Sequence, residues 1–192
     1  MAKILAVNGS PRHEGNTAQM LNTVLKICKS AGHETELFQA GGREVRGCLA
    51  CVACFKTHPG VCATDDWMNE VYKKMVAADA VILGSPTYFS DLTPEMKAVI
   101  DRCGYLSRSD KMSLSRKIGA AVSAVRRAGA IHTLDSMQHF FTINDMIVVG
   151  SSYWNMSIAR GMGEYEKDDE GVKTMTRLGE NIVWLLEKVG GQ

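Results

Sequence analysis

The sequence predicts an α/β protein in which a parallel sheet of five strands is covered by helices on both faces. The first observation is an alternation along all 192 residues. Short apolar runs, typical of strands buried on both faces, alternate with segments whose apolar residues follow a helical period. The second observation is that 45% of the residues are hydrophobic, which is enough for one substantial core. We therefore expect a single doubly wound domain over residues 1–192.

The expected elements follow one another in a regular order. A first strand at Ile4–Val7 precedes a turn and an amphipathic helix, and residues 33–40 read as a less hydrophobic second strand nearer an edge. Residues 41–64 are irregular and rich in Cys and Gly, and irregular segments of such length usually have a function. The later strands are expected at 79–84, 117–125 and 146–149, and the later helices near 65–76, 93–103, 130–141 and 175–189.

The loop after the first strand has the character of an anion site. It brings hydroxyl, amide and guanidinium groups to the start of a helix, where free N–H groups and the helix dipole favour negative charge. The spacing is neither that of a dinucleotide-binding loop nor that of a P-loop, so a mononucleotide with one phosphate fits better, FMN first among them. An ordinary turn with Asn16 or Thr17 as N-cap is the alternative. The candidate phosphate ligands are Ser10, Arg12, Asn16 and Thr17.

Polar loops follow three of the expected strands, at residues 8–17, 85–91 and 123–130. The carboxyl ends of parallel strands lie at one edge of the sheet, and ligands bind there where the strand order reverses. We therefore expect the three loops to form one site.

Four cysteines are clustered as Cys-x2-Cys-x2-Cys-x7-Cys within the irregular segment. Four thiolates are the full ligand set of a [4Fe–4S] cluster, and the closely spaced triplet suits it. Zinc prefers two separated pairs, although four thiolates also bind zinc. Reduced thiols or a disulfide remain the alternative to a metal. The cysteines concerned are Cys48, Cys51, Cys54 and Cys62, whereas Cys28 and Cys103 have the helical spacing of core residues.

The net charge of +1 gives no reason to expect nucleic acid or an acidic membrane surface as a partner. The N-terminal residues do not resemble a signal peptide, and Ile4–Val7 is far too short to span a bilayer. We therefore expect a cytoplasmic protein.

These motifs, in this order, resemble the flavodoxin-like NADPH-dependent FMN reductases and, within them, the iron-sulfur flavoproteins. The resemblance covers nearly the whole chain. It implies the strand order 2-1-3-4-5, FMN at the edge of the sheet, and assembly into homodimers or homotetramers. The motifs that carry it are Gly9-Ser-Pro-Arg with Gly15-Asn-Thr17, Gly84-Ser-Pro-Thr-Tyr-Phe89 with Met96-Lys97, Ile100-Asp-Arg102, and the cysteine pattern.

The resemblance also assigns roles to residues. It implies that the candidates in the first loop hold the FMN phosphate, and that the second loop lines the ribityl chain and the isoalloxazine. The third loop is expected near the pyrimidine edge, with Arg126 and Gly129 as candidates. Arg126-Arg127 would either stabilise anionic reduced flavin or remain solvated, since related reductases often have a more Gly-rich turn here. The second-loop candidates are Pro86, Thr87, Tyr88 and Phe89.

We therefore expect an FMN-dependent oxidoreductase that moves electrons between a [4Fe–4S] cluster, FMN and a small-molecule acceptor. Its electron donor is expected to be ferredoxin-like or NAD(P)H. The alternatives are an NAD(P)H-dependent FMN or quinone reductase without a cluster, an electron carrier, and a zinc-stabilised binding module. No catalytic acid or base is needed, because the cofactors carry the chemistry. Tyr153 and Trp154, expected in a loop after the last strand, are candidates for a subunit interface.

Overall fold

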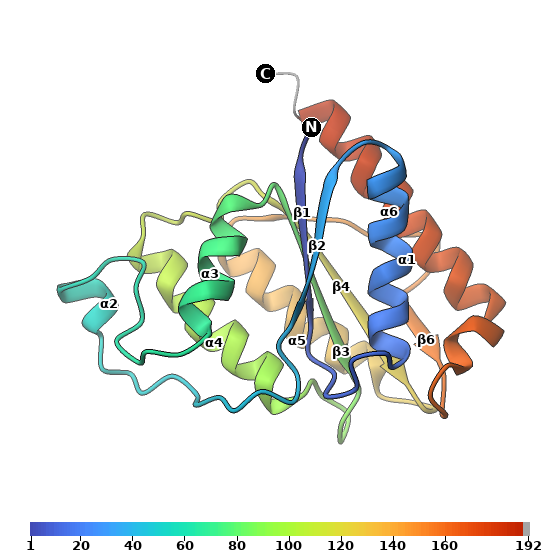
Figure 1. The fold of residues 1–192 in the computed structure, drawn as a ribbon, viewed down its shortest axis with the longest axis horizontal. Coiled ribbons are helices and arrows are strands. Elements are labelled where there is room, and N and C mark those ends of the chain that lie inside the picture. Colours follow the sequence, from blue (N-terminus) through green and yellow to red (C-terminus); the bar gives the residue numbers. More distant parts are fainter. Residues whose placement is uncertain (190–192) are drawn as a thin grey trace.

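The structure, a computed structural model, describes residues 1–189 and consists of one parallel sheet between two layers of helices (Figure 1). Helices α1 and α6 cover one face, and α3, α4 and α5 cover the other. The strands are β1 (Lys3–Asn8), β2 (Glu34–Gln39), β3 (Ala80–Pro86), β4 (Ile118–Val125), β5 (Ile147–Val148) and β6 (Met156–Ile158). The helices are α1 (Asn16–Ser30), α2 (Ala53–Lys56), α3 (Met68–Ala77), α4 (Pro94–Ser109), α5 (Ala130–Ile143), the 3₁₀ turn η1 (Glu164–Lys167) and α6 (Asp169–Val189).

The strand order β2-β1-β3-β4-β5 confirms the predicted order. The prediction of five strands was incomplete, because the last place in the sheet is shared by two short strands. β5 pairs with Ile118 and Gly119 at the start of β4, and β6 pairs with Ser123–Val125 at its end. β6 has three residues, too few to show a strand period, and it lies in a segment predicted as loop. The loop with Tyr153 and Trp154 thus separates β5 from β6 instead of following the last strand.

The core has two layers because successive side chains of each central strand point to opposite faces. In β1, Leu5 and Val7 pack toward α3, α4 and α5, whereas Ile4 and Ala6 pack toward α1 and α6. This explains the continuous apolar run of β1. Cys28 and Cys103 are fully buried in the two layers, as predicted, and burial raises the pKa of Cys28 to about 11.

Helix α6 begins at an acidic segment whose first residue is an N-cap. The Asp168 carboxylate accepts hydrogen bonds from the Gly171 N–H at 3.0 Å, the Ser157 hydroxyl at 2.7 Å and the Ile158 N–H at 3.0 Å. Burial by itself would raise the pKa of Asp168, but these hydrogen bonds outweigh it and lower the pKa. Asp168 therefore joins β6 to α6.

Along residues 1–189, no helix combines the length and apolar character needed to cross a membrane.

Asp168→Ala should lower the free energy of unfolding by about 1–2 kcal/mol at neutral pH, because it removes an N-cap and two further hydrogen bonds. A lowered pKa means that folding favours the ionised carboxylate. The contribution of the Asp168 carboxylate to the free energy of unfolding is complete above its ordinary pKa of about 3.9. It is lost as the pH falls through the lower pKa that Asp168 has in the folded protein. Urea unfolding at several pH values should show the difference from wild type shrinking in acid. The exposed neighbour Asp169, replaced by Ala, is the matched control.

Candidate functional site

One cleft of about 190 Å³ lies at the carboxyl edge of the sheet, where the loops after β1, β3 and β4 meet. The segment after β6 completes its wall. The structure thus brings together every predicted FMN-site residue except Phe89 and Gly129. The lining residues are Ser10, Arg12, Gly15, Asn16, Thr17, Pro86, Thr87, Tyr88, Ala124, Arg126, Ala159 and Arg160.

The start of helix α1 forms one end of the cleft. Gly15, and neither Asn16 nor Thr17, is the N-cap residue, and no side chain caps the helix. A Cβ at Gly15 would lie 2.9 Å from Cβ of Arg12, so this tight turn favours glycine. The first N–H groups of a helix have no partner within the helix. This uncapped end is therefore available to an anion, as the loop sequence indicated.

The first loop is held in place by two amide side chains at the ends of β1 and β2. The Asn8 side chain donates to Gln39 at 2.7 Å and accepts from the Ser10 N–H at 3.0 Å. The Gln39 amide donates to the carbonyls of Ser10 and Gly41, each at 2.7 Å. These hydrogen bonds fix the loop before a ligand binds. Gln39 was not predicted as a site residue, because its role depends on the parallel register that places it opposite Asn8.

Three exposed arginines come to this cleft from three loops: Arg12, Arg126 and Arg160. Within residues 1–189, the ion pairs formed with carboxylates involve other basic residues. The cleft therefore carries positive charge that suits an anion. Arg160 was missed because the strand β6 that delivers it was not predicted.

The Asn16 side chain makes two hydrogen bonds to the backbone of the segment after β6. Its side-chain amide donates to the Gly161 carbonyl at 2.8 Å, and its oxygen accepts from the Tyr165 N–H at 3.2 Å. The side chain thus ties α1 to the segment that carries Arg160. Only the backbone N–H of Asn16, at the start of the helix, remains for a bound anion. Ser10 and Thr17 are buried beside it.

The second loop forms a tight turn beside the cleft. Tyr88 and Asp91 exchange backbone hydrogen bonds at 2.7 and 3.0 Å, and Phe89 and Ser90 between them have left-handed φ angles of 48° and 64°. This geometry places Phe89 at the tip, fully exposed and outside the cleft lining. The Thr87 hydroxyl lies 3.0 Å from that of Ser123 on β4, so the loop is anchored to the sheet.

The third loop contacts the second loop through Gly129. Gly129 has a φ of +92°, and a Cβ there would lie 2.9 Å from Oγ of Ser90. The residue lines a neighbouring apolar cavity of about 390 Å³, not the cleft itself. Tyr153 and Trp154 form another wall of that cavity, with ring centroids 4.8 Å apart.

The four clustered cysteines line a separate small cavity between the 47–64 segment and α4. Cys48 and Cys51 are exposed, Cys54 is buried, and Cys62 is partly buried. Burial raises the pKa of the Cys54 thiol. In residues 1–189, no three Cys, His, Asp or Glu side chains form a group that could hold a single metal ion.

The backbone curves sharply around Cys51. Its neighbours Ala50 and Val52 have left-handed φ angles of 50° and 54°, which are costly for side chains with a Cβ and rare for a β-branched residue. This cost shows that the rest of the segment holds the backbone on both sides of Cys51 in an unfavourable conformation. Figure 1 shows this segment with α2 on the α3 and α4 side of the sheet, away from α1.

Arg102 of α4 connects the ends of the cysteine segment. It is 2% exposed and makes a two-pronged ion pair with Asp66, at 2.6 and 2.7 Å. Its guanidinium also donates to the carbonyls of Arg46 at 3.2 Å and Thr64 at 3.3 Å, and to the sulfur of Cys62 at 3.1 Å. Burial alone would lower the pKa of Arg102, but the hydrogen bonds to Asp66 and Cys62 outweigh it and raise the pKa. The guanidinium is therefore charged.

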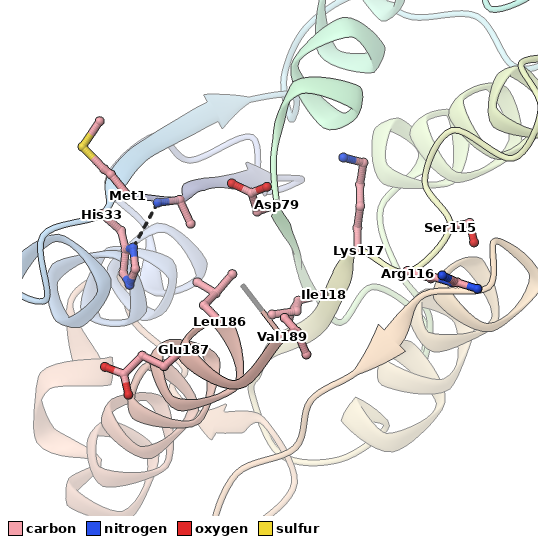
Figure 2. A pocket seen from close by; sticks show the side chains of 11 residues that line it. Met1, His33, Asp79, Ser115, Arg116, Lys117, Ile118, Leu186, Glu187 and Val189 are labelled. Atoms are coloured by element: carbon pink, nitrogen blue, oxygen red, sulfur yellow. Dashed lines mark hydrogen bonds between the residues drawn. The ribbon is translucent and has the colours of Figure 1, made fainter. Parts of the chain in front are cut away.

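A cavity of about 560 Å³ lies at the opposite, amino end of the strands (Figure 2). Three of its polar side chains already have partners in the protein. Lys117 donates to the Ala78 carbonyl at 2.6 Å, His33 accepts from the Ala2 N–H at 3.2 Å, and Asp79 accepts from the Lys3 N–H at 2.8 Å. One arginine, Arg116, lines this cavity, whereas three arginines and an uncapped helix start meet at the carboxyl edge. The carboxyl edge is therefore the better candidate for a functional site.

Comparison with known proteins agrees with this geometry. The chain is 32% identical to an iron-sulfur flavoprotein of Methanocaldococcus jannaschii, over 97% of this chain and 98% of the relative. It is also 32% identical to an iron-sulfur flavoprotein of Methanosarcina thermophila, over 97% of this chain and 96% of that protein. A flavodoxin from the domain Archaea superposes with a TM-score of 0.63 at 16% identity, covering 96% of this chain and 99% of the flavodoxin. This last likeness shows that the fold is flavodoxin-like.

The family model for NADPH-dependent FMN reductases matches residues 2–161, which include β1 and every loop that lines the cleft up to Arg160. The chain belongs to the NADPH-dependent FMN reductase family and is a flavin-dependent oxidoreductase.

Proposed function

We propose that the chain binds FMN in the cleft at the carboxyl edge and moves electrons between this flavin, a [4Fe–4S] cluster and a small-molecule acceptor. One observation carries the proposal: an uncapped helix start and three arginines lie in the same cleft, and within residues 1–189 none of these arginines has a carboxylate partner. Membership of the NADPH-dependent FMN reductase family supports FMN as the ligand.

In this proposal the phosphate lies at the start of α1. Ser10, Arg12 and Thr17 supply side-chain groups, and Asn16 supplies its backbone N–H. Arg160 adds a second positive charge. The ribityl chain and the ring follow the cleft along Pro86, Thr87 and Tyr88 toward Arg126, with Gly129 and Phe89 in the adjacent loops. A guanidinium near the ring favours negative charge on reduced flavin.

The cysteine cavity supports the second cofactor through its donor set. Four thiols on one cavity match the ligand number of a [4Fe–4S] cluster. The ligands of a cubane bind four different iron atoms and stand further apart than the ligands of one zinc ion. The lack of a compact metal-binding group in residues 1–189 therefore counts more against zinc than against a cluster. The donor set fits a cluster, with Cys48, Cys51, Cys54 and Cys62 as its ligands.

When bound, FMN exchanges one or two electrons and the cluster exchanges one. A ferredoxin-like donor would deliver single electrons through the cluster, whereas NAD(P)H, the other candidate donor, would deliver two electrons as hydride to the flavin. The protein's own residues would bind and orient the two groups. A second candidate is an NAD(P)H-dependent FMN or quinone reductase without a cluster. The exposure of Cys48 and Cys51 favours it, because exposed thiols need no metal.

Replacing both Arg12 and Thr17 with Ala should weaken FMN binding. Loss of the charged hydrogen bond from Arg12 alone removes about 1.5–3 kcal/mol, roughly a ten- to hundredfold rise in Kd. Fluorescence titration of the apoprotein with FMN measures this. The matched control is Thr176→Ala with Arg177→Ala on α6, which removes the same two residue types from another surface. Equal Kd values for the two double variants would contradict the phosphate site.

We also propose that the chain assembles as a homodimer or homotetramer through the surface at Tyr153 and Trp154. Both side chains are more than half exposed, at 53% and 57%, beside an apolar cavity. Exposed aromatic clusters are typical of interfaces. Light scattering at micromolar concentration should give at least twice the mass of one chain, and Trp154→Asp should lower it. A wild-type monomer under these conditions would refute the proposal.

A further inference from the structure

Arg102 makes one contact that anchoring the loop does not require. Its ion pair with Asp66 and its bonds to the carbonyls of Arg46 and Thr64 already hold both ends of the cysteine segment against α4. The remaining contact, from Nη2 to the sulfur of Cys62 at 3.1 Å, joins a charged donor to a cysteine sulfur, and the sulfur of a thiol is a weak acceptor. A thiolate that ligates iron is a far better acceptor, so this arrangement suits a metal-bound sulfur.

Cys62 is also held from its other side. Its N–H donates to the Asn69 side chain at 2.8 Å, and its carbonyl accepts from the same side chain at 3.1 Å. Asn69 thus fixes the backbone of Cys62, and Arg102 fixes its sulfur. Cys48 and Cys51, which line the same cavity, are exposed. The fold therefore fixes both the backbone and the sulfur of Cys62.

We propose that Arg102 is a positioning residue that donates a charged hydrogen bond to the Cys62 sulfur of the cluster and thereby raises the cluster's reduction potential. The inference rests on the proposed function, because it requires the cluster. Its physical basis is that the reduced cluster carries one more negative charge, which a nearby guanidinium and an N–H···S hydrogen bond stabilise. The guanidinium fork contacts four residues at once, which explains why arginine suits the position better than lysine.

The test uses the full chain, reconstituted anaerobically with iron and sulfide. Arg102→Gln should shift the midpoint potential of the cluster to more negative values, and Arg102→Lys, which keeps the charge but not the fork, should give a smaller shift. Arg108→Gln is the matched control, since Arg108 is an exposed arginine on the same helix. A potential for Arg102→Gln equal to that of Arg108→Gln would overturn the proposal.

A second measurement needs no variant and so does not depend on the folding of Arg102→Gln. Wild-type protein carrying ¹⁵N only in its arginine guanidinium groups should show ¹⁵N hyperfine coupling in pulsed EPR of the reduced cluster. A cluster without that coupling would overturn the role of Arg102 and leave the proposed function standing. Wild-type protein that takes up no iron would instead refute the cluster itself, and with it this inference.

Discussion

Cys51→Ser is expected to yield a protein that holds no iron and still binds FMN like the wild type. A cubane that loses one of four thiolate ligands is usually lost. Cys51 is exposed, so the substitution should cost the fold little. The cysteine cavity and the cleft at the carboxyl edge have no lining residue in common, since the first is lined by α4 and the second by the start of α1. These two helices cover opposite faces of the sheet (Figure 1). Iron and flavin should therefore respond independently.

Iron per chain and flavin per chain, measured after the same anaerobic reconstitution, test this expectation. Transfer of single electrons from a ferredoxin-like donor should disappear together with the iron. Cys28→Ala is the matched control, because Cys28 is buried between α1 and the sheet and should leave the four ligands intact. Wild-type iron content in Cys51→Ser, or an iron-free wild type, would leave the cluster-free reductase as the better description.

The prediction of the fold succeeded where local pattern and global packing agree. The apolar run Ile4–Val7 predicted a strand buried on both faces, and the structure places its residues in both layers of the core. The N-cap Thr93, followed by Pro94, was also predicted from the sequence. In the structure the Thr93 hydroxyl accepts a hydrogen bond from the Met96 N–H at 3.3 Å. β6 was not predicted, because three residues are too few to show the alternation of a strand. Its place in the sheet depends on its pairing with β4, which is distant in sequence.

The candidate site was predictable to the extent that it follows strands in sequence. Ser10, Arg12, Thr87 and Arg126 come directly after β1, β3 and β4, so the topology alone gathers them. Three features depend on long-range contacts that no local pattern shows. The first is the pair of hydrogen bonds between the Asn16 side chain and the backbone of Gly161 and Tyr165. The second is the position of Arg160, which follows β6 and lines the cleft. The third is the contact of Arg102 with the cysteine segment.

Gly41 follows β2 and packs against the backbone of the loop after β1. Its N–H donates to the Asn8 carbonyl at 2.9 Å, and its carbonyl accepts from Gln39. A Cβ at this position would lie 2.3 Å from the carbonyl carbon and oxygen of Ser10 and 2.4 Å from the Gly9 oxygen. These are backbone atoms, which cannot rotate away as a side chain can.

Gly41→Ala should therefore displace the loop that carries Ser10 and Arg12. Overpacking of this kind costs about 1–3 kcal/mol, and a displaced phosphate site should raise the Kd for FMN by roughly ten- to a hundredfold. Gly47→Ala is the matched control, because a Cβ at Gly47 meets no atom within 4 Å. Flavin titration and urea unfolding of both variants measure the effect. If Gly41→Ala bound FMN as tightly as Gly47→Ala, the phosphate would not depend on this loop, and the site at the start of α1 would be wrong.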